Sequence, residues 1–94
     1  MRLDKEQKAA LEKAIENVKG EVYLFGSRVD DGKNGGDIDI LVFSKENASG
    51  LAREISVKFF MECEEKIDVT VMNPDQLTRE QEAFLRVIKK EKLK

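Results

Sequence analysis

Three aspartates in two strand-like segments are the side chains most suited to chemistry in this 94-residue chain. Asp37 and Asp39 open the apolar segment 37–43, and their i, i+2 spacing places both carboxylates on one face of a strand. Asp68 stands opposite the aliphatic residues of the segment 66–72. If the two strands are neighbours with their aliphatic faces aligned, all three acids share one side. Carboxylates this close repel each other unless a cation lies between them, so the pattern predicts a site for Mg²⁺ or Mn²⁺.

A simpler interpretation competes with the metal site, because solvent-facing acids on two amphipathic strands would show the same alternation. A single aspartate at the start of a strand favours that simpler interpretation. The complete set of acids favours the metal site, since aspartate is normally depleted inside strands.

The turn before these acids has the residues of an anion site. The segment 22–25 is a short apolar strand, and Gly26 ends it where the chain must turn sharply. Ser27 has the character of a helix N-cap, and Arg28 follows it. Backbone N–H groups, a hydroxyl and a guanidinium at one turn can hold an anion. We therefore expect Gly26, Ser27 and Arg28 to bind phosphate.

Other catalytic and metal-binding patterns fail on spacing or composition. The stretch from Gly26 to Lys33 superficially resembles a P-loop, but its glycines are too far apart and Asn34 stands where a hydroxyl residue is required. The chain has no histidine, which excludes serine–histidine and cysteine–histidine catalysis. Cys63 is the only cysteine, so zinc is not expected.

Together, Leu-Phe-Gly-Ser-Arg at 24–28, a short glycine-rich loop and Gly-Asp-Ile-Asp-Ile-Leu-Val at 36–42 resemble the signature of the DNA polymerase β-like nucleotidyltransferases. Within that superfamily the chain most resembles the minimal nucleotidyltransferase (MNT) domains that are often paired with HEPN toxin proteins. The resemblance covers nearly the whole chain. The chain departs from the commonest minimal form in a shorter spacer, in Asp30 and Asp31, and in Gly36.

The resemblance implies an Mg²⁺-dependent nucleotidyltransferase that moves a nucleoside monophosphate, AMP from ATP, onto a hydroxyl. In such an enzyme Asp37, Asp39 and Asp68 are catalytic and ligate two Mg²⁺, while Gly26 and Ser27 hold the triphosphate. We expect Arg28 to assist at the outer phosphates. The resemblance also implies an antitoxin that modifies a partner protein, a HEPN-type toxin.

A function of a different class stays open: a binding module that neutralises a partner protein by occlusion, with weak or absent catalysis. Asp30 and Asp31, close to the phosphate turn in sequence, lend this alternative weight. The sequence also leaves open the acceptor, the nucleotide preference and whether the chain forms homo-oligomers.

Composition limits the surroundings in which the chain can work. Its length fits a single domain, 1–94, with a modest core. A net charge of −2 argues against broad nucleic-acid binding. One cysteine cannot form an intramolecular disulfide, and the apolar runs are far shorter than the ~20 residues of a membrane span. We expect a cytoplasmic protein that does not enter membranes.

Helical and strand patterns alternate along the chain and predict an α/β fold of order α-β-(α)-β-α-β-α. We expect a small mixed sheet with helices packed on one face, as in the polymerase β-like fold that the resemblance implies. The expected helices are 4–19, 48–62 and one from Thr78, and the expected strands are 21–25, 37–43 and 66–72, with a short helical turn from Ser27.

Two further expectations concern helix surfaces. Phe60 and Met61 are expected in the core, because a helix as long as 48–62 must bury a face. The basic residues near the C-terminus are expected to complement the dipole of the last helix; they are Arg86, Lys89, Lys90, Lys92 and Lys94.

Overall fold

The computed structural model describes residues 2–29 and 37–94, so Asp30, Asp31 and Gly36 lie outside the described residues. Strands β3, β2, β1 and β4 lie side by side in that order, with β2 and β3 parallel and β1 antiparallel to both its neighbours. The elements in chain order are α1 (Lys5–Ile15), β1 (Glu21–Phe25), the 3₁₀ turn η1 (Gly26–Val29), β2 (Ile38–Phe43), α2 (Ala48–Cys63), β3 (Ile67–Met72), α3 (Arg79–Val87) and β4 (Lys90–Lys92). The predicted mixed sheet of an α/β fold is confirmed.

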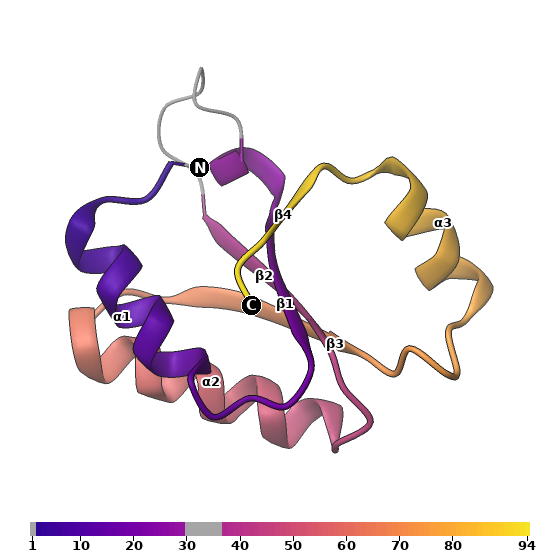
Figure 1. The fold of residues 1–94 in the computed structure, drawn as a ribbon, viewed down its shortest axis with the longest axis horizontal. Coiled ribbons are helices and arrows are strands. Elements are labelled where there is room, and N and C mark those ends of the chain that lie inside the picture. Colours follow the sequence, from indigo (N-terminus) through magenta and orange to yellow (C-terminus); the bar gives the residue numbers. More distant parts are fainter. Residues whose placement is uncertain (1, 30–36) are drawn as a thin grey trace.

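One face of the sheet is covered by α1 and α2 (Figure 1). Alternate residues of β2 point toward these helices, so the strand's period of two separates its aliphatic row from Asp39. The strand residues of this core are Val22, Leu24, Ile38, Ile40, Val42 and Ile67, and the helices add Ala10, Leu11, Ala14, Ile15, Leu51, Ile55 and Phe59. This core is the main reason that the sheet holds its register.

The opposite face of the sheet carries a smaller cluster under α3. Phe25, Leu41 and Met72 are buried there, and Phe84 of α3 packs edge-to-face on Phe25 with ring centroids 5.5 Å apart. Figure 1 shows α3 on the other side of the strands from α1 and α2. The expectation of helices on one face therefore describes α1 and α2, whereas α3 contributes to the face from which Asp39 projects.

The helix starts follow the sequence signals closely. Asp4 and Gln7 form a capping box at α1, and Thr78 and Gln81 form one at α3. α1 ends at Ile15 rather than at 19.

Gly20 lies where the chain that enters β1 passes close to the end of β2. A Cβ on Gly20 would lie 2.1 Å from the carbonyl oxygen of Phe43, and its φ is +133°. Only glycine allows the chain entering β1 to pass this close to the end of β2.

The chain between 90 and 92 is a strand, not a continuation of the last helix. β4 pairs antiparallel with β1, so the placement of the C-terminal lysines on a helix end is wrong for Lys90 and Lys92. Lys94 does meet a helix end, but that of α1: its Nζ donates to the carbonyl oxygens of Ile15 at 3.0 Å and Glu16 at 2.7 Å. Lys94 therefore complements the dipole of α1, a helix that is distant from it in the sequence.

The prediction that Phe60 and Met61 lie in the core is also wrong. Phe60 is 47% exposed and Met61 is 78% exposed. The buried face of α2 is the row Leu51, Ile55 and Phe59, on the opposite side of the helix.

None of the helices in 2–29 and 37–94 is long and apolar enough to cross a membrane.

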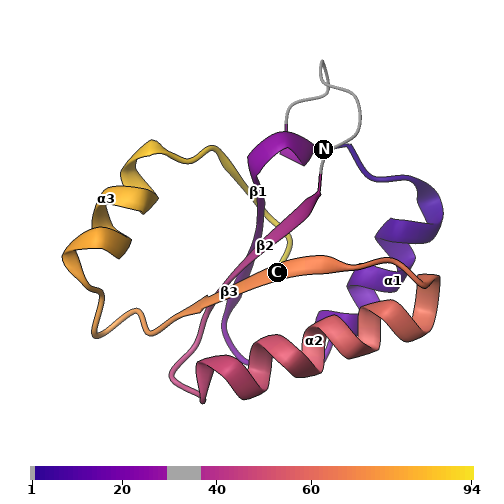
Figure 2. The same cartoon turned by 180° about the vertical axis from the view of Figure 1, so that it is seen from behind.

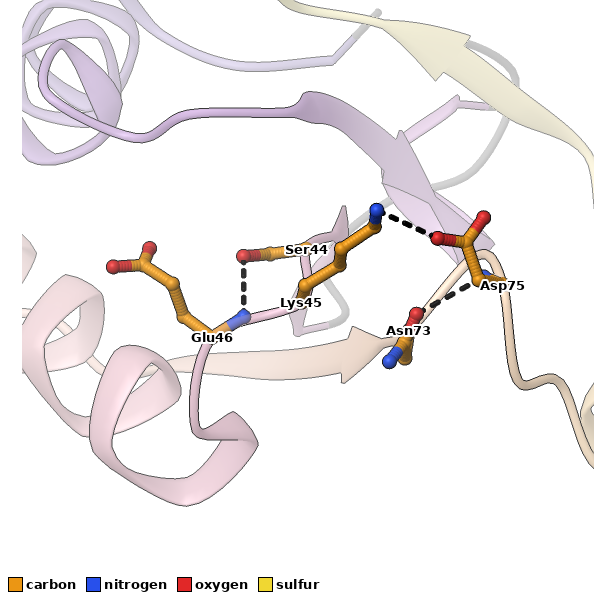
Figure 3. Close-up of polar contacts among 5 residues, drawn as sticks. All are labelled: Ser44, Lys45, Glu46, Asn73 and Asp75. Atoms are coloured by element: carbon orange, nitrogen blue, oxygen red, sulfur yellow. Dashed lines mark hydrogen bonds and ion pairs between the residues drawn. The ribbon is translucent and has the colours of Figure 1, made fainter.

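Polar contacts connect the loops that follow β2 and β3, at the end of the parallel pair opposite Asp39 and Asp68 (Figure 3). Lys45 and Asp75 form an ion pair at 2.7 Å, and the backbone N–H of Ser44 donates to the carbonyl of Met72 at 3.0 Å. Each loop is also closed on itself, by Ser44 with Glu46 and by Asn73 with Asp75. The exposed ion pair adds little energy. Its position nevertheless shows that the loops leave the sheet together, as in-register strands require.

Candidate active site

Asp39 and Asp68 lie side by side at the start of the parallel strands. They are register partners in the β2–β3 pair, so their side chains leave the same face of the sheet. Asp37 precedes Ile38, the first residue of β2, and is exposed, as is Asp68. The structure thus brings two of the predicted acids together and places the third at the entrance to β2.

Electrostatic repulsion is already present at Asp39. Partial burial raises the pKa of its carboxyl above the ordinary value, and the nearby charges of Asp68 and then Asp37 raise that pKa further. The ionised form of Asp39 is therefore disfavoured when only protein surrounds it. A bound cation would reverse this balance, because it would favour the ionised carboxylates.

Gly26 makes the closest approach to Asp39. Its φ is +76°, and a Cβ built on it would lie 2.6 Å from Asp39 Oδ2. The pairing of Phe25 with Asp39 across β1 and β2 is what brings the glycine to the carboxylate. Any side chain at position 26 would strain the turn and displace the acid. Glycine is therefore required twice here, for the backbone angle and for the space that Asp39 occupies.

The turn Gly26–Val29 is held by the segment that precedes α1. The Arg2 N–H donates to the Arg28 carbonyl at 2.7 Å, and Arg2 Nη2 donates to the Ser27 carbonyl at 3.3 Å. In return, Arg28 Nη1 donates to the Arg2 carbonyl at 3.0 Å and to Gln7 Oε1 at 3.4 Å. Arg28 thus orders the turn. Its contact with an outer phosphate remains a prediction.

Gln7 is a structural residue of the site that the sequence pattern did not reveal. It is 5% exposed, and besides capping α1 it donates from Nε2 to both carboxylate oxygens of Glu65, at 3.0 and 3.3 Å. Glu65 lies just before β3, so Gln7 links the turn at Arg28 to the strand that carries Asp68. The only sequence signal was the capping box, which explains part of these bonds.

The donor set suits a hard divalent cation. Asp37, Asp39 and Asp68 offer carboxylate oxygens, the ligands that Mg²⁺ and Mn²⁺ prefer. Within residues 2–29 and 37–94, however, no group of three or more His, Cys, Asp or Glu side chains is arranged closely enough to hold a metal ion. The three acids therefore have the oxygen ligands that such a cation requires. Among the described residues, strand pairing holds Asp39 and Asp68 side by side.

A family model decides the class of the protein. The model, described as a nucleotidyltransferase domain, matches residues 5–94. The chain belongs to this nucleotidyltransferase family. The match runs from the first residue of α1 through β4, so it includes the turn, the acids and the strand that pairs with β1. No curated protein and no solved structure gives a significant match.

Membership confirms the broader part of the resemblance seen in the sequence. The small mixed sheet with its helices is the polymerase β-like nucleotidyltransferase fold, and the general activity is nucleotidyl transfer. Such domains typically use nucleoside triphosphates and divalent metals.

Proposed function

We propose that this nucleotidyltransferase moves AMP from ATP onto a hydroxyl of a partner protein, as the antitoxin of a toxin–antitoxin pair; the acceptor oxygen bonds to the α-phosphorus, loses its proton, and pyrophosphate leaves. The observation that carries the proposal is the Asp39–Asp68 pair set against Gly26 at the end of β1. It joins an acidic site to a turn suited to phosphate, which is the juxtaposition that transfer from a triphosphate requires.

The residues of the chain have separate tasks in this reaction. Ser27 and the backbone amides of its turn hold the outer phosphates, and Arg28 keeps that turn in place through Arg2 and Gln7. Asp37 and Asp39 would hold both metal ions, and Asp68 would bind the catalytic ion and favour the ionised form of the acceptor hydroxyl. Two bound Mg²⁺ would supply charge neutralisation for the triphosphate and make the acceptor oxygen a better nucleophile.

The open position of the acids supports a macromolecular acceptor. Asp37 and Asp68 are exposed and Asp39 is only partly buried, so a large partner can reach the reacting centre. A protein that presents a hydroxyl side chain could also supply the missing wall of the site. A HEPN-type toxin is the partner that we propose, with tyrosine as the modified residue.

Mass spectrometry of the product of the adjacent gene tests the proposal. Incubation with this protein, ATP and Mg²⁺ is expected to add an adenylyl group to that product. An Asp39→Asn variant is the control, because it keeps the shape of the site and removes a charge. If the partner gains no mass but is still neutralised by Asp39→Asn, the occlusion alternative replaces the transferase proposal.

A further inference from the structure

α2 carries a second apolar row that is about half exposed or more. Val57, Phe60 and Met61 are 49%, 47% and 78% exposed. They lie on the side of the helix opposite the buried row Leu51, Ile55 and Phe59. Among the described residues, Val87 is the only other large hydrophobic residue that is exposed. Apolar exposure is therefore concentrated on one helix surface, as at sites of protein association.

Opposite charges flank this row. Arg53 precedes Val57 by one helical turn, and Glu64 follows Phe60 by the same interval. Arg53, Val57 and Phe60 have the spacing of one seam of a coiled coil, and Glu64 is the C-cap residue directly after α2, in the left-handed conformation. Within 2–29 and 37–94, neither Arg53 nor Glu64 forms an ion pair. We call these five residues, including Met61, the α2 stripe.

The other charges around the stripe are already paired within the chain. Lys58 binds Glu54 along α2 at 3.4 Å, and Lys13 of α1 binds Glu62 at 3.2 Å. Lys13, Lys58 and Glu62 lie beside Met61, so the charges of the stripe that have no ion pair among the described residues are Arg53 at one end and Glu64 at the other.

We propose that the α2 stripe docks on the α2 stripe of a second copy of this chain, with the two helices antiparallel. The midpoint of Val57 and Phe60 in the sequence is also the midpoint of Arg53 and Glu64. A two-fold axis at that point places Val57 over Phe60 of the second copy, and it brings Arg53 to the end of the second copy's α2, where Glu64 is the C-cap. A parallel arrangement would instead oppose like charges. The stripe is thus self-complementary, as a two-fold interface requires.

The dimer leaves both candidate sites accessible. α2 covers the aliphatic face of the sheet, while Asp39 and Asp68 project from the other face. Figure 2 shows α2 running along the edge of the molecule, on the far side of the strands from α3. Association through the stripe does not depend on nucleotidyl transfer, and its test uses no activity.

A contact made by one helix from each copy is small, so the dimer should be weak. Specific interfaces below about 1,200 Å² belong to transient complexes. We expect the dissociation constant to lie roughly between micromolar and millimolar, which corresponds to about −8 to −4 kcal/mol. Sedimentation equilibrium over that concentration range should show a reversible monomer–dimer equilibrium for the wild-type protein.

A matched pair of substitutions tests the position of the interface. Met61→Gln and Val87→Gln each remove an exposed apolar side chain, at 78% and 80% exposure, on different helices. Met61→Gln should weaken the dimer at least about tenfold, because each substitution acts twice across a two-fold axis. Val87→Gln should leave it unchanged. A protein that stays monomeric throughout, or a dimer that ignores Met61→Gln, would overturn the proposal.

Charge exchange tests the antiparallel register. Arg53→Glu alone and Glu64→Arg alone should each weaken the dimer roughly tenfold, since two attractive contacts become repulsive. An equimolar mixture of the two variants should recover wild-type affinity, because each variant then meets the charge it lacks. Circular dichroism should show unchanged helix content. Failure of the mixture to associate better than either variant alone would refute the register.

Discussion

Replacing Asp39 with asparagine should stabilise the protein when no metal is present. The substitution removes one charge from the Asp39–Asp68 pair at nearly constant shape. In the folded state burial and the two neighbouring acids raise the pKa of Asp39, so its ionisation costs free energy that the unfolded chain does not spend. Asparagine in its place avoids that cost. Burial of Asp39 and its repulsion by the neighbouring acids therefore lower the stability of the metal-free wild type at neutral pH.

The size of the effect follows from the strand geometry. Neighbouring strands are about 4.8 Å apart, so carboxylates in register start from roughly that separation. At about 5 Å, two unit charges repel by about 0.8 kcal/mol in water and about 3 kcal/mol at an effective dielectric constant of 20. Because Asp68 is exposed, the lower figure applies more closely. A gain of about 1 kcal/mol corresponds to an increase in Tm of about 4–8 °C for a domain of this size.

The pH dependence of stability gives an independent test of the sign of the Asp39→Asn effect. Below the ordinary Asp pKa of 3.8 the carboxyl is protonated in both states, and Asp39 has no effect on stability. As the pH rises from 3.8 through the raised pKa, the unfolded chain releases its proton first, and wild-type stability falls. The advantage of Asp39→Asn should therefore be full at neutral pH and shrink on acidification through that window.

Thermal melts in EDTA, and in Mg²⁺ with a non-hydrolysable ATP analogue, provide the assay. Asp39→Asn should melt higher than wild type in EDTA and lose most of the ligand-induced increase, which follows mass action. Glu12→Gln is the matched control: it makes the same chemical change at an exposed position on α1, across the sheet from the acids. Equal melting of wild type and Asp39→Asn in EDTA, with an undiminished ligand shift, would mean that the acids do not form one site.

Three further outcomes follow from the site. Gly26→Ala should lower the free energy of unfolding by about 1–2 kcal/mol through the positive φ alone. In an Asp39→Ala background the clash should vanish, so urea melts of the four proteins should show coupling, and strict additivity would contradict the contact. Ser27→Ala should weaken ATP binding by about 1.5–3 kcal/mol and AMP binding less; equal losses would remove Ser27 from the phosphate site. Calorimetry should show Mn²⁺ binding that nucleotide strengthens and that Asp37→Ala/Asp39→Ala abolishes, whereas equal heats for both proteins would reject the acidic site.

Local patterns were enough to predict the site-bearing strands. Strand alternation separated Asp39 and Asp68 from the aliphatic rows, and the register of β2 with β3 then aligned the two acids. The start of each capped helix was equally readable, because Asp4 and Thr78 each act within one turn. In all these cases the interaction that decides the structure spans only a few residues or repeats with a fixed period.

The features missed by the sequence depend on contacts between distant segments. β4 is a three-residue edge strand of charged residues, and only its pairing with β1 makes it a strand. Gln7 has a helix-cap pattern, yet its side chain also joins Arg28 and Glu65, 21 and 58 residues away. The sequence predicts Phe60 in the core, and this is wrong because periodicity identifies a helix with apolar rows but does not show which row the sheet covers.

The arrangement of the acids also predicts that nucleotide and cation binding are linked. Within the described residues only Asp39 and Asp68 are aligned by strand pairing, and no three acids form a closed ligand group. A cation at this pair would therefore have coordination positions left for oxygens from outside the protein, and triphosphate oxygens at the Ser27 turn could fill them. Thermodynamic linkage makes the effect on affinity reciprocal. If nucleotide strengthens metal binding by some factor, metal must strengthen nucleotide binding by the same factor. Gly26 lies between the two halves, since its backbone starts the turn and its missing Cβ leaves room for Asp39. We therefore expect a side chain at position 26 to weaken the coupling between metal and nucleotide binding.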